Sequence, residues 1–422
     1  MFHRKLYFAV AMTVAVATSL ASPVSAAEPA VWTLESAARR ALEIAPELRA
    51  ARAEVAAREG TWREADAWPN PTVGLSRSDK LGLEDGAGGT DLTQLEIRQP
   101  LPLRRLSRER TVAAAGIEGA RERTRLERLK LEREAARAYH RLQLAQARRR
   151  LAEERVDLAD KSVVARDRLV RYLAPAERER LAVLREQARL GLFGAQAEEE
   201  RAAIAFRTRL ALPPQTAVEV ALLALPAVPP GLDALEKNIE THPALAAAQR
   251  DTEAAQAGIA AAESRRFGDP ELALFRERDF INGSRRNVAG IGLSVQVPLW
   301  NTNPGPVQRA RAEAMAAQTR AQMAQRDARA SLASAYAQLV RLREQAVRAE
   351  GQMLAPAGRV LALTRRGFEA GEVNVLAFVD ALNTWAEAGA RSRELLAESA
   401  EAAAELRLTA GQPLLPEQEV QP

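Results

Sequence analysis

The chain has 422 residues, of which 60 are lysine or arginine, 55 are aspartate or glutamate and none is cysteine. The absence of cysteine excludes disulfide bonds and the attachment of a lipid through an N-terminal cysteine. Because both signs of charge are interspersed along the chain, the sequence indicates a solvated helical surface and argues against a nucleic-acid-binding protein.

The first 26 residues have the layout of a secretory signal peptide. Arg4 and Lys5 precede an apolar run at 6–20, and Ala26 ends a cleavage-site pattern. The alternative is an uncleaved anchor, which the short length of the apolar run disfavours. We therefore expect an exported chain with a signal peptide at 1–26. No later segment contains about 18 consecutive apolar residues, so a second transmembrane helix is not indicated.

The rest of the sequence consists of two similar halves. LEIRQPL at 95–101 corresponds to LSVQVPL at 293–299, and Pro46 corresponds to Pro243. Further matches in the same order predict a tandem duplication. The chain then divides into repeat 1 at 27–212, a proline-rich linker at 213–231, repeat 2 at 232–411 and a C-terminal tail at 412–422.

Each repeat is predicted to contain a helix, two strands, a very long helix and a shorter helix, in that order. The long helix at 104–172 contains no proline and would be roughly 100 Å long, so its apolar face must be buried along a coiled coil. In repeat 1 we expect a helix at 34–66, strands at 71–79 and 91–100, and helices at 104–172 and 176–211. In repeat 2 we expect a helix at 233–266, strands at 270–278 and 288–298, and helices at 305–367 and 372–409.

The four predicted strands alternate apolar and polar residues, and turn-rich segments at 82–90 and 281–287 would join them in pairs. Such strands are long enough to cross a bilayer when tilted, although an ordinary soluble sheet gives the same alternation. Four strands cannot enclose an open lumen, so a membrane location would require several chains to share one barrel. The face predicted to contact lipid carries Val73, Leu75, Leu95, Ile97, Leu272, Leu274, Ile291, Leu293 and Val295, and the face predicted to line the lumen carries Glu96, Arg98 and Gln296.

Residues that could perform catalysis are sparse. His140 and His242 are isolated in the sequence, and no motif has the spacing of a metal site or a nucleotide-binding loop. We therefore expect no cofactor, no metal site and no enzymatic activity. The alternative to a membrane barrel shared by several chains is a soluble periplasmic adaptor or scaffold built from coiled-coil hairpins. Such a protein would not readily explain two strand pairs flanked by full-length helices.

Several stretches resemble the TolC-type outer-membrane efflux channels along nearly the whole mature chain. They include LSVQVPLWNTNPGPVQRARAE at 293–313, RRGFEAGEVNVLAFVDALNTWAEA at 365–388 and LRLTAG at 406–411. PNPTVGLS at 69–76 and LEIRQPLPL at 95–103 resemble the branch that serves heavy-metal resistance pumps of the cobalt–zinc–cadmium and copper–silver kind.

The resemblance implies a mainly α-helical fold with a small transmembrane β part. Three chains would each give four strands to one twelve-stranded barrel, and their helices would form a periplasmic tunnel. Its implied partners are a periplasmic adaptor, a proton-driven inner-membrane pump and outer-membrane lipid, and its implied cargo is heavy-metal cations. Ala174-Pro175 stands where the family usually has a glycine. The turns implied to dock the adaptor or pump contain Arg171, Tyr172, Ala174 and Pro175 in repeat 1, and Arg366, Gly367, Phe368, Gly371, Glu372 and Val373 in repeat 2.

Overall fold

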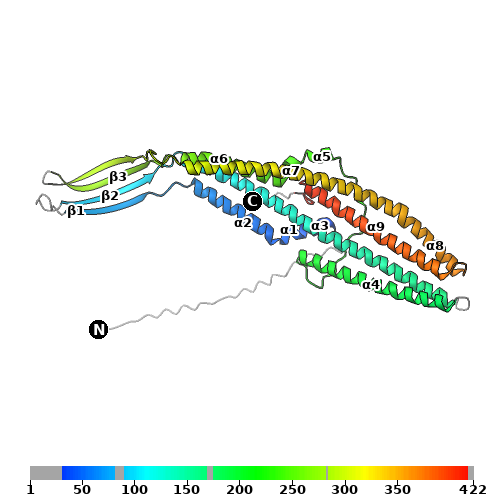
Figure 1. Cartoon of the computed structure of the whole chain (residues 1–422). Helices are drawn as coiled ribbons and strands as arrows, with labels where there is room; N and C mark the ends of the chain where they lie inside the picture. The colour runs from blue at the N-terminus through cyan, green and yellow to red at the C-terminus, as the bar shows by residue number, and fades with distance from the viewer. Residues whose placement is uncertain (1–30, 81–89, 169–173, 282–283, 417–422) are drawn as a thin grey trace, which may run out of the picture.

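The computed structural model describes residues 31–80, 90–168, 174–281 and 284–416. The described molecule is elongated, with a β-sheet at one end and a body of long helices that ends in a helical tip at the other (Figure 1). The expected signal peptide at 1–26 lies outside the described residues, as do nearly all of the expected loop at 82–90 and Arg171 and Tyr172.

Repeat 1 follows the predicted order of elements, with one correction. The helix expected at 34–66 is broken at Ala45, whose extended ψ of 115° is explained by the proline that follows it. Pro46 then occupies the first turn of the second helix, where its missing N–H is tolerated. The elements are α1 (Leu34–Ile44), α2 (Pro46–Asp66), β1 (Thr72–Lys80), β2 (Thr90–Pro100), α3 (Arg105–Arg168) and α4 (Pro175–Arg209).

Repeat 2 has the same order and is broken at the equivalent place. His242 is extended before Pro243, so the helix expected at 233–266 is split as its counterpart is. The last helix begins at Val375 and not at 372. The elements are α5 (Leu232–Glu236), η1 (Ile239–Thr241), α6 (Pro243–Ser264), β3 (Glu271–Ile281), β4 (Ser284–Ser294), α7 (Pro304–Arg348), η2 (Ala349–Leu354), α8 (Ala355–Glu369) and α9 (Val375–Thr409).

The four strands form one antiparallel sheet in the order β1-β2-β3-β4. The fourth strand was expected at 288–298, but β4 begins at Ser284 and ends at Ser294. Residues 284–287, expected in a loop, therefore belong to the strand. The reason is the pairing with β3, which runs from Ile281 opposite Ser284 to Glu271 opposite Ser294. Beyond Ser294, β3 offers no further partner because it begins at Glu271.

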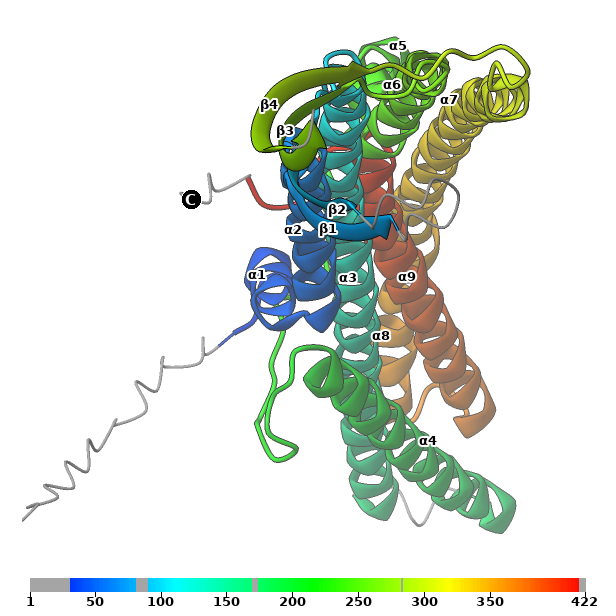
Figure 2. The same ribbon diagram turned by 90° about the vertical axis from the view of Figure 1, so that its left-hand side faces the viewer.

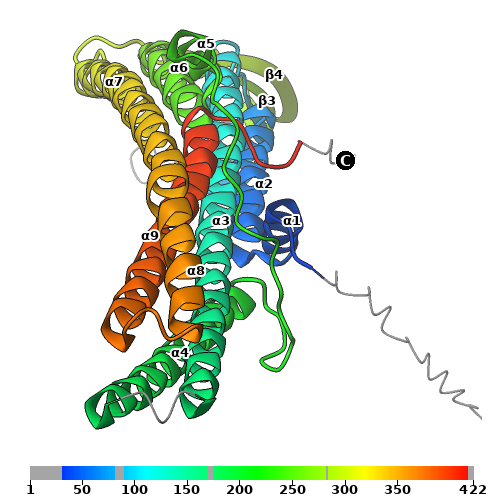
Figure 3. The ribbon, with the colours of Figure 1, turned by 90° about the vertical axis from the view of Figure 1, so that its right-hand side faces the viewer.

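The long helices pack side by side and bury a series of separate apolar clusters. One cluster joins Trp32, Tyr139 and Phe206 in repeat 1, and another joins Ile239 and Leu332 to α9 in repeat 2. Figures 2 and 3, seen from the two ends, show α3 beside α9 and the α7–α8 rod beside α9, in agreement with the contacts between these helices. The predicted burial along extended helix pairs is what stabilises such rods.

The second long helix is not uniform. Its six residues Ala349–Leu354 form a π-helical segment, and Pro356 follows one residue later, after Ala355. Proline has no N–H to donate within a helix, and its ring crowds the carbonyl group of the preceding turn. The wider π-helical turn accommodates both effects. α3 contains no proline and is a continuous α-helix over its described length.

The linker between the repeats is extended and is held against α3. The backbone N–H of Trp32, just before α1, donates to Glu219 O at 2.7 Å. The backbone carbonyl oxygen of Trp32 accepts from the Ala221 N–H at 3.1 Å. The amide of Gln143 donates to Ala221 O at 2.8 Å, and the amide of Gln146 donates to Val218 O at 2.9 Å. These bonds satisfy backbone groups of the linker, including those that form an isolated parallel bridge between Trp32 and Val220.

The C-terminal segment is anchored on the same helix. Glu132 is fully buried; it accepts a hydrogen bond from Leu414 N–H at 2.6 Å and pairs with Arg128 at 3.0 Å. Burial raises the pKa of the Glu132 carboxyl, although the Leu414 N–H and Arg128 each act to lower it. The contact fastens the C-terminal tail to the long helix of repeat 1.

The protonation of His242 allows the start of α6 to be tested by changing the pH. Its Nδ1 accepts the Ala244 N–H at 3.1 Å and so caps α6. Burial, and then the charge of Arg133, lower the pKa of His242. A lowered pKa means that the stability contribution is present above the ordinary value of about 6.5 and is lost as the pH falls through the folded-state pKa.

We expect His242→Asn to reduce the loss of stability between about pH 7.5 and about pH 5, because asparagine keeps a capping oxygen and does not titrate. The measurement is the urea midpoint of the detergent-solubilised protein at both pH values. The contribution of His140 is common to both proteins and cancels. An unchanged pH dependence in the variant would contradict the lowered pKa of His242.

Candidate functional site: the sheet, the neck and the tip

One face of the sheet is apolar and exposed over its half nearest the helices, while toward the hairpins the same face carries Arg77, Arg276 and Arg278. The register places Val73 opposite Ile97, and Ile97 opposite Leu274. Leu75 is 75% exposed and Ile291 is 76% exposed. A continuous apolar surface of this kind marks a membrane or protein contact. Eight of the residues expected on the lipid side share this face: Val73, Leu75, Leu95, Ile97, Leu272, Leu274, Ile291 and Leu293.

The opposite face carries Glu96 and Arg98, which form an ion pair at 2.8 Å. Two residues expected in the strand lie outside it. Val295 and Gln296 follow the end of β4, and the side chain of Gln296 packs beside Gly268, at the base of the sheet. The alternation in the sequence continues through these residues, but the hydrogen-bonded partner strand does not.

Exposed aromatic side chains stand at the end of the sheet nearest the helices. Trp68 precedes β1, Phe267 precedes β3 and Trp300 follows β4; they are 57%, 50% and 93% exposed. Aromatic residues of this exposure are typical of the boundary between membrane and water. In the sequence, WPNP at 68–71 corresponds to FGDP at 267–270, so Trp68 and Phe267 occupy equivalent positions before the first strand of each repeat.

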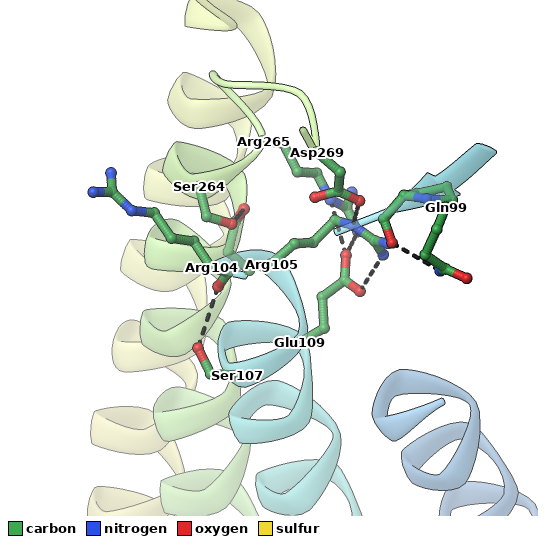
Figure 4. A network of polar contacts seen from close by, with 10 residues as sticks. Gln99, Arg104, Arg105, Ser107, Glu109, Ser264, Arg265 and Asp269 are labelled. Carbon is green, nitrogen blue, oxygen red and sulfur yellow. Dashed lines mark hydrogen bonds and ion pairs between the residues drawn. The ribbon is translucent and has the colours of Figure 1, made fainter. Parts of the chain in front are cut away.

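A polar network lies at the neck, where the sheet meets the helices (Figure 4). Arg105, at the start of α3, contacts Asp269 at 2.9 Å and Glu109 at 2.8 Å. Arg265, at the end of α6, contacts the same Glu109 at 2.7 Å. Leu101 N–H also donates to Pro270 O at 2.7 Å. The network joins repeat 1 to repeat 2, and no motif in the sequence predicted it because its members lie far apart in the chain.

The tip of repeat 2 is a compact helix ending. Gly371 has a φ of +78°, which strongly favours glycine. Its N–H donates to Phe368 O at 3.0 Å, and the Glu372 N–H donates to Gly367 O at 2.8 Å. This pair of bonds is the Schellman helix ending. A Cβ at Gly367 would lie 2.6 Å from Cγ2 of Val373, so a side chain at this position would displace Val373.

A small core supports this turn. Phe368 and Phe378 are stacked with ring centroids 5.1 Å apart, and both are buried. They belong to a cluster that also contains Leu181 of α4 and Ala159 of α3. All four helices at the tip therefore contribute to one core, which fixes the turn relative to the neighbouring coiled-coil pair.

The tip of repeat 1 is described only from Ala174 onward. Ala174 precedes α4 in an extended conformation, and its N–H donates to the Glu177 carboxylate at 3.1 Å. Pro175 begins the helix, where proline is well tolerated. α4 thus begins at a proline, whereas the equivalent helix α9 of repeat 2 begins after Asn374, whose side chain accepts from the Ala377 N–H at 2.9 Å.

The histidines considered as candidates for catalysis make structural contacts. His140 is buried and its Nδ1 lies 3.0 Å from the Gln143 Oε1. Burial lowers the pKa of His140. Within the described ranges, no three His, Asp or Glu residues lie close enough together to hold a metal ion. None of the helices in the described part of the chain is long and apolar enough to cross a membrane.

The sequence matches the family described as outer membrane efflux protein over residues 37–203 and 234–412. These segments make up most of the chain, and each begins and ends near the boundaries of one repeat. The chain therefore belongs to the outer membrane efflux protein family. It is an outer-membrane channel protein with a long periplasmic helical extension, and it is not an enzyme.

Individual relatives agree with this assignment. The chain is 27% identical over 383 residues to the cobalt-zinc-cadmium resistance protein CzcC of Cupriavidus metallidurans, covering 88% of each chain. Its fold is similar to that of CusC, with a TM-score of 0.73 and 19% identity over 92% of this chain and 96% of that one. It is also similar to VceC of Vibrio cholerae, with a TM-score of 0.72 and 16% identity over 90% of this chain and 97% of that one. The mainly helical fold with four strands in each chain is thereby confirmed.

The glycine ending at the tip can be tested locally. We expect Gly371→Ala to destabilise the turn by about 1–2 kcal/mol, because a side chain is strained at positive φ. Hydrogen exchange of the amides around the turn should accelerate accordingly. Gly358→Ala in α8 is the matched control, since its nearest neighbour, Trp385 Cδ1, would lie at 3.9 Å. Equal protection in the two variants would disprove the requirement for glycine at the turn.

Proposed function

We propose that three copies of this chain form the outer-membrane exit duct of a three-component efflux system. The observation that carries the proposal is the exposed apolar face of a four-stranded sheet with open edges. Within the described residues, β1 has only β2 as a neighbour and β4 only β3. Unpaired strand edges are not tolerated in lipid, so the sheet needs further strands to close it.

The number of strands argues for several copies. Four strands are too few to enclose a water-filled lumen, and the same sheet repeated by rotation gives a closed barrel. In a twelve-stranded barrel of three chains, the apolar face would contact lipid and the Glu96–Arg98 face would line the lumen. A soluble adaptor or scaffold is the second candidate, but it would leave this apolar face in water.

The helical tip is the proposed docking site for a periplasmic adaptor and an inner-membrane pump. Arg366, Gly371 and Glu372 are exposed there, while Phe368 fixes the turn from within. The repeat 1 turn, with Arg171, Tyr172, Ala174 and Pro175, is proposed as the second docking surface. Because the channel passes its cargo by diffusion, the energy for export would come from the pump.

Heavy-metal cations are the proposed cargo. The support is the similarity to the cobalt-zinc-cadmium resistance protein over 88% of this chain. Selection of the cation would rest with the pump.

The cargo is tested by deletion of the gene in its own host. We expect the deletion strain to lose tolerance to cobalt, zinc or cadmium salts and to keep its tolerance to organic antibiotics. Growth inhibition concentrations measure both. A complementing plasmid with the intact gene should restore metal tolerance. Equal metal tolerance with and without the gene would refute the heavy-metal assignment.

The orientation of the sheet is tested by a pair of neighbouring substitutions. Leu293→Arg places a charge on the apolar face and should cost about 2–4 kcal/mol of insertion near the bilayer midplane. Ser294→Arg places the same charge on the opposite face and should be tolerated. The measurement is the amount of trimer in outer-membrane fractions. Similar yields of both variants would contradict the proposed orientation.

A further inference from the structure

Phe275 lies over a glycine on the neighbouring strand. It is half-buried on β3, on the face that carries Glu96, and is paired with Gly290 of β4. A Cβ built at Gly290 would lie 2.3 Å from Cζ of the ring and 2.8 and 2.9 Å from Cε2 and Cε1. The ring therefore fills the space that any side chain at Gly290 would need, so it lies along the sheet and covers the bare backbone of β4.

The other glycines on this face have no such cover. A Cβ at Gly292 would lie 3.5 Å from Cβ of Ala273, which is an ordinary contact. A Cβ at Gly74 on β1 would meet nothing within 4 Å. Gly290 is therefore distinguished from its neighbours by the aromatic ring and not by the backbone, since none of the three has a positive φ.

The position of the ring has a direct consequence for a channel. Side chains on a strand ordinarily stand roughly perpendicular to the sheet. A phenylalanine displaced from Gly290 would adopt such a rotamer and project from the Glu96–Arg98 face. In a barrel of three chains, three rings at the same height would then narrow the lumen with apolar surface.

We propose that Phe275 is a determinant of the bore and that Gly290 is the positioning residue that keeps its ring flat against the wall. The inference rests on the proposed function, in which the Glu96–Arg98 face lines the lumen of a barrel of several chains. The flat ring leaves the polar Glu96–Arg98 pair as the projecting surface beside it, which suits the passage of hydrated solutes.

The absence of cysteine from the chain allows a local readout. Ser294 is exposed on the same face, nearer the helices than Phe275, and pairs with Glu271. A solute that enters from the hairpin end must pass the Phe275 level to reach it. The experiment uses the full chain with Ser294→Cys in intact cells and measures the rate of labelling by membrane-impermeant maleimides of graded size.

Adding Gly290→Ala should slow labelling by the larger maleimides and leave the smallest one unaffected. Gly292→Ala adds the same methyl group to the same strand and should leave every rate unchanged. Phe275→Leu combined with Gly290→Ala should restore the rates. Phe275→Ala alone should accelerate labelling by the larger reagents, and it keeps the inference testable if Gly290→Ala fails to assemble.

Failure of the inference about Phe275 can be distinguished from failure of the proposed function. If the Ser294→Cys protein is labelled from outside but neither Gly290→Ala nor Phe275→Ala changes the size dependence, the role of the ring is refuted and the channel assignment is untouched. If the Ser294→Cys protein reaches the outer membrane and even the smallest maleimide does not label it, the proposed lumen orientation fails. Equal slowing by Gly290→Ala and Gly292→Ala would also refute the inference, because it would show that added volume alone narrows the passage.

Discussion

The architecture depends on the unpaired edges of a four-stranded sheet with one apolar face. In lipid, every backbone N–H and C=O must be paired within the protein, so a sheet with two open edges cannot exist alone. In water, the exposed apolar face would favour aggregation. The proposed trimer resolves both problems at once, because repetition by rotation pairs the edges and turns one face to lipid and the other to the lumen.

The helical body continues the proposed channel from the sheet into the periplasm. Its rods have no single core; they are stabilised by successive small clusters that each join helices from different parts of the chain. The neck network of Arg105, Glu109, Arg265 and Asp269 makes the link between sheet and body a contact between the two repeats. The two halves of the chain can therefore behave as one unit, since strand pairing between β2 and β3 and the neck network both cross the boundary between them.

The duplication does not make the repeats identical. Repeat 2 interrupts its long helix with a π-helical segment near Pro356 and ends it with a glycine turn over the Phe368–Phe378 pair. Repeat 1 has a continuous α3 and enters α4 through Ala174-Pro175. The shared pattern of elements thus includes two different helix starts after the tip, with Pro175 opening α4 and the side chain of Asn374 capping α9.

Local sequence patterns were enough to predict the order of elements and which residues within β1–β4 share a face, because periodicities of 2 and 3.6 residues are local properties of the backbone. The breaks before Pro46 and Pro243 were also encoded locally, although the periodicity alone overlooked them. The end of β4 depends instead on tertiary contacts, since Val295 and Gln296 continue the alternation and lack a partner strand. The neck ion pairs and the ring of Phe275 over Gly290 likewise arise from contacts between distant segments, which no local pattern encodes.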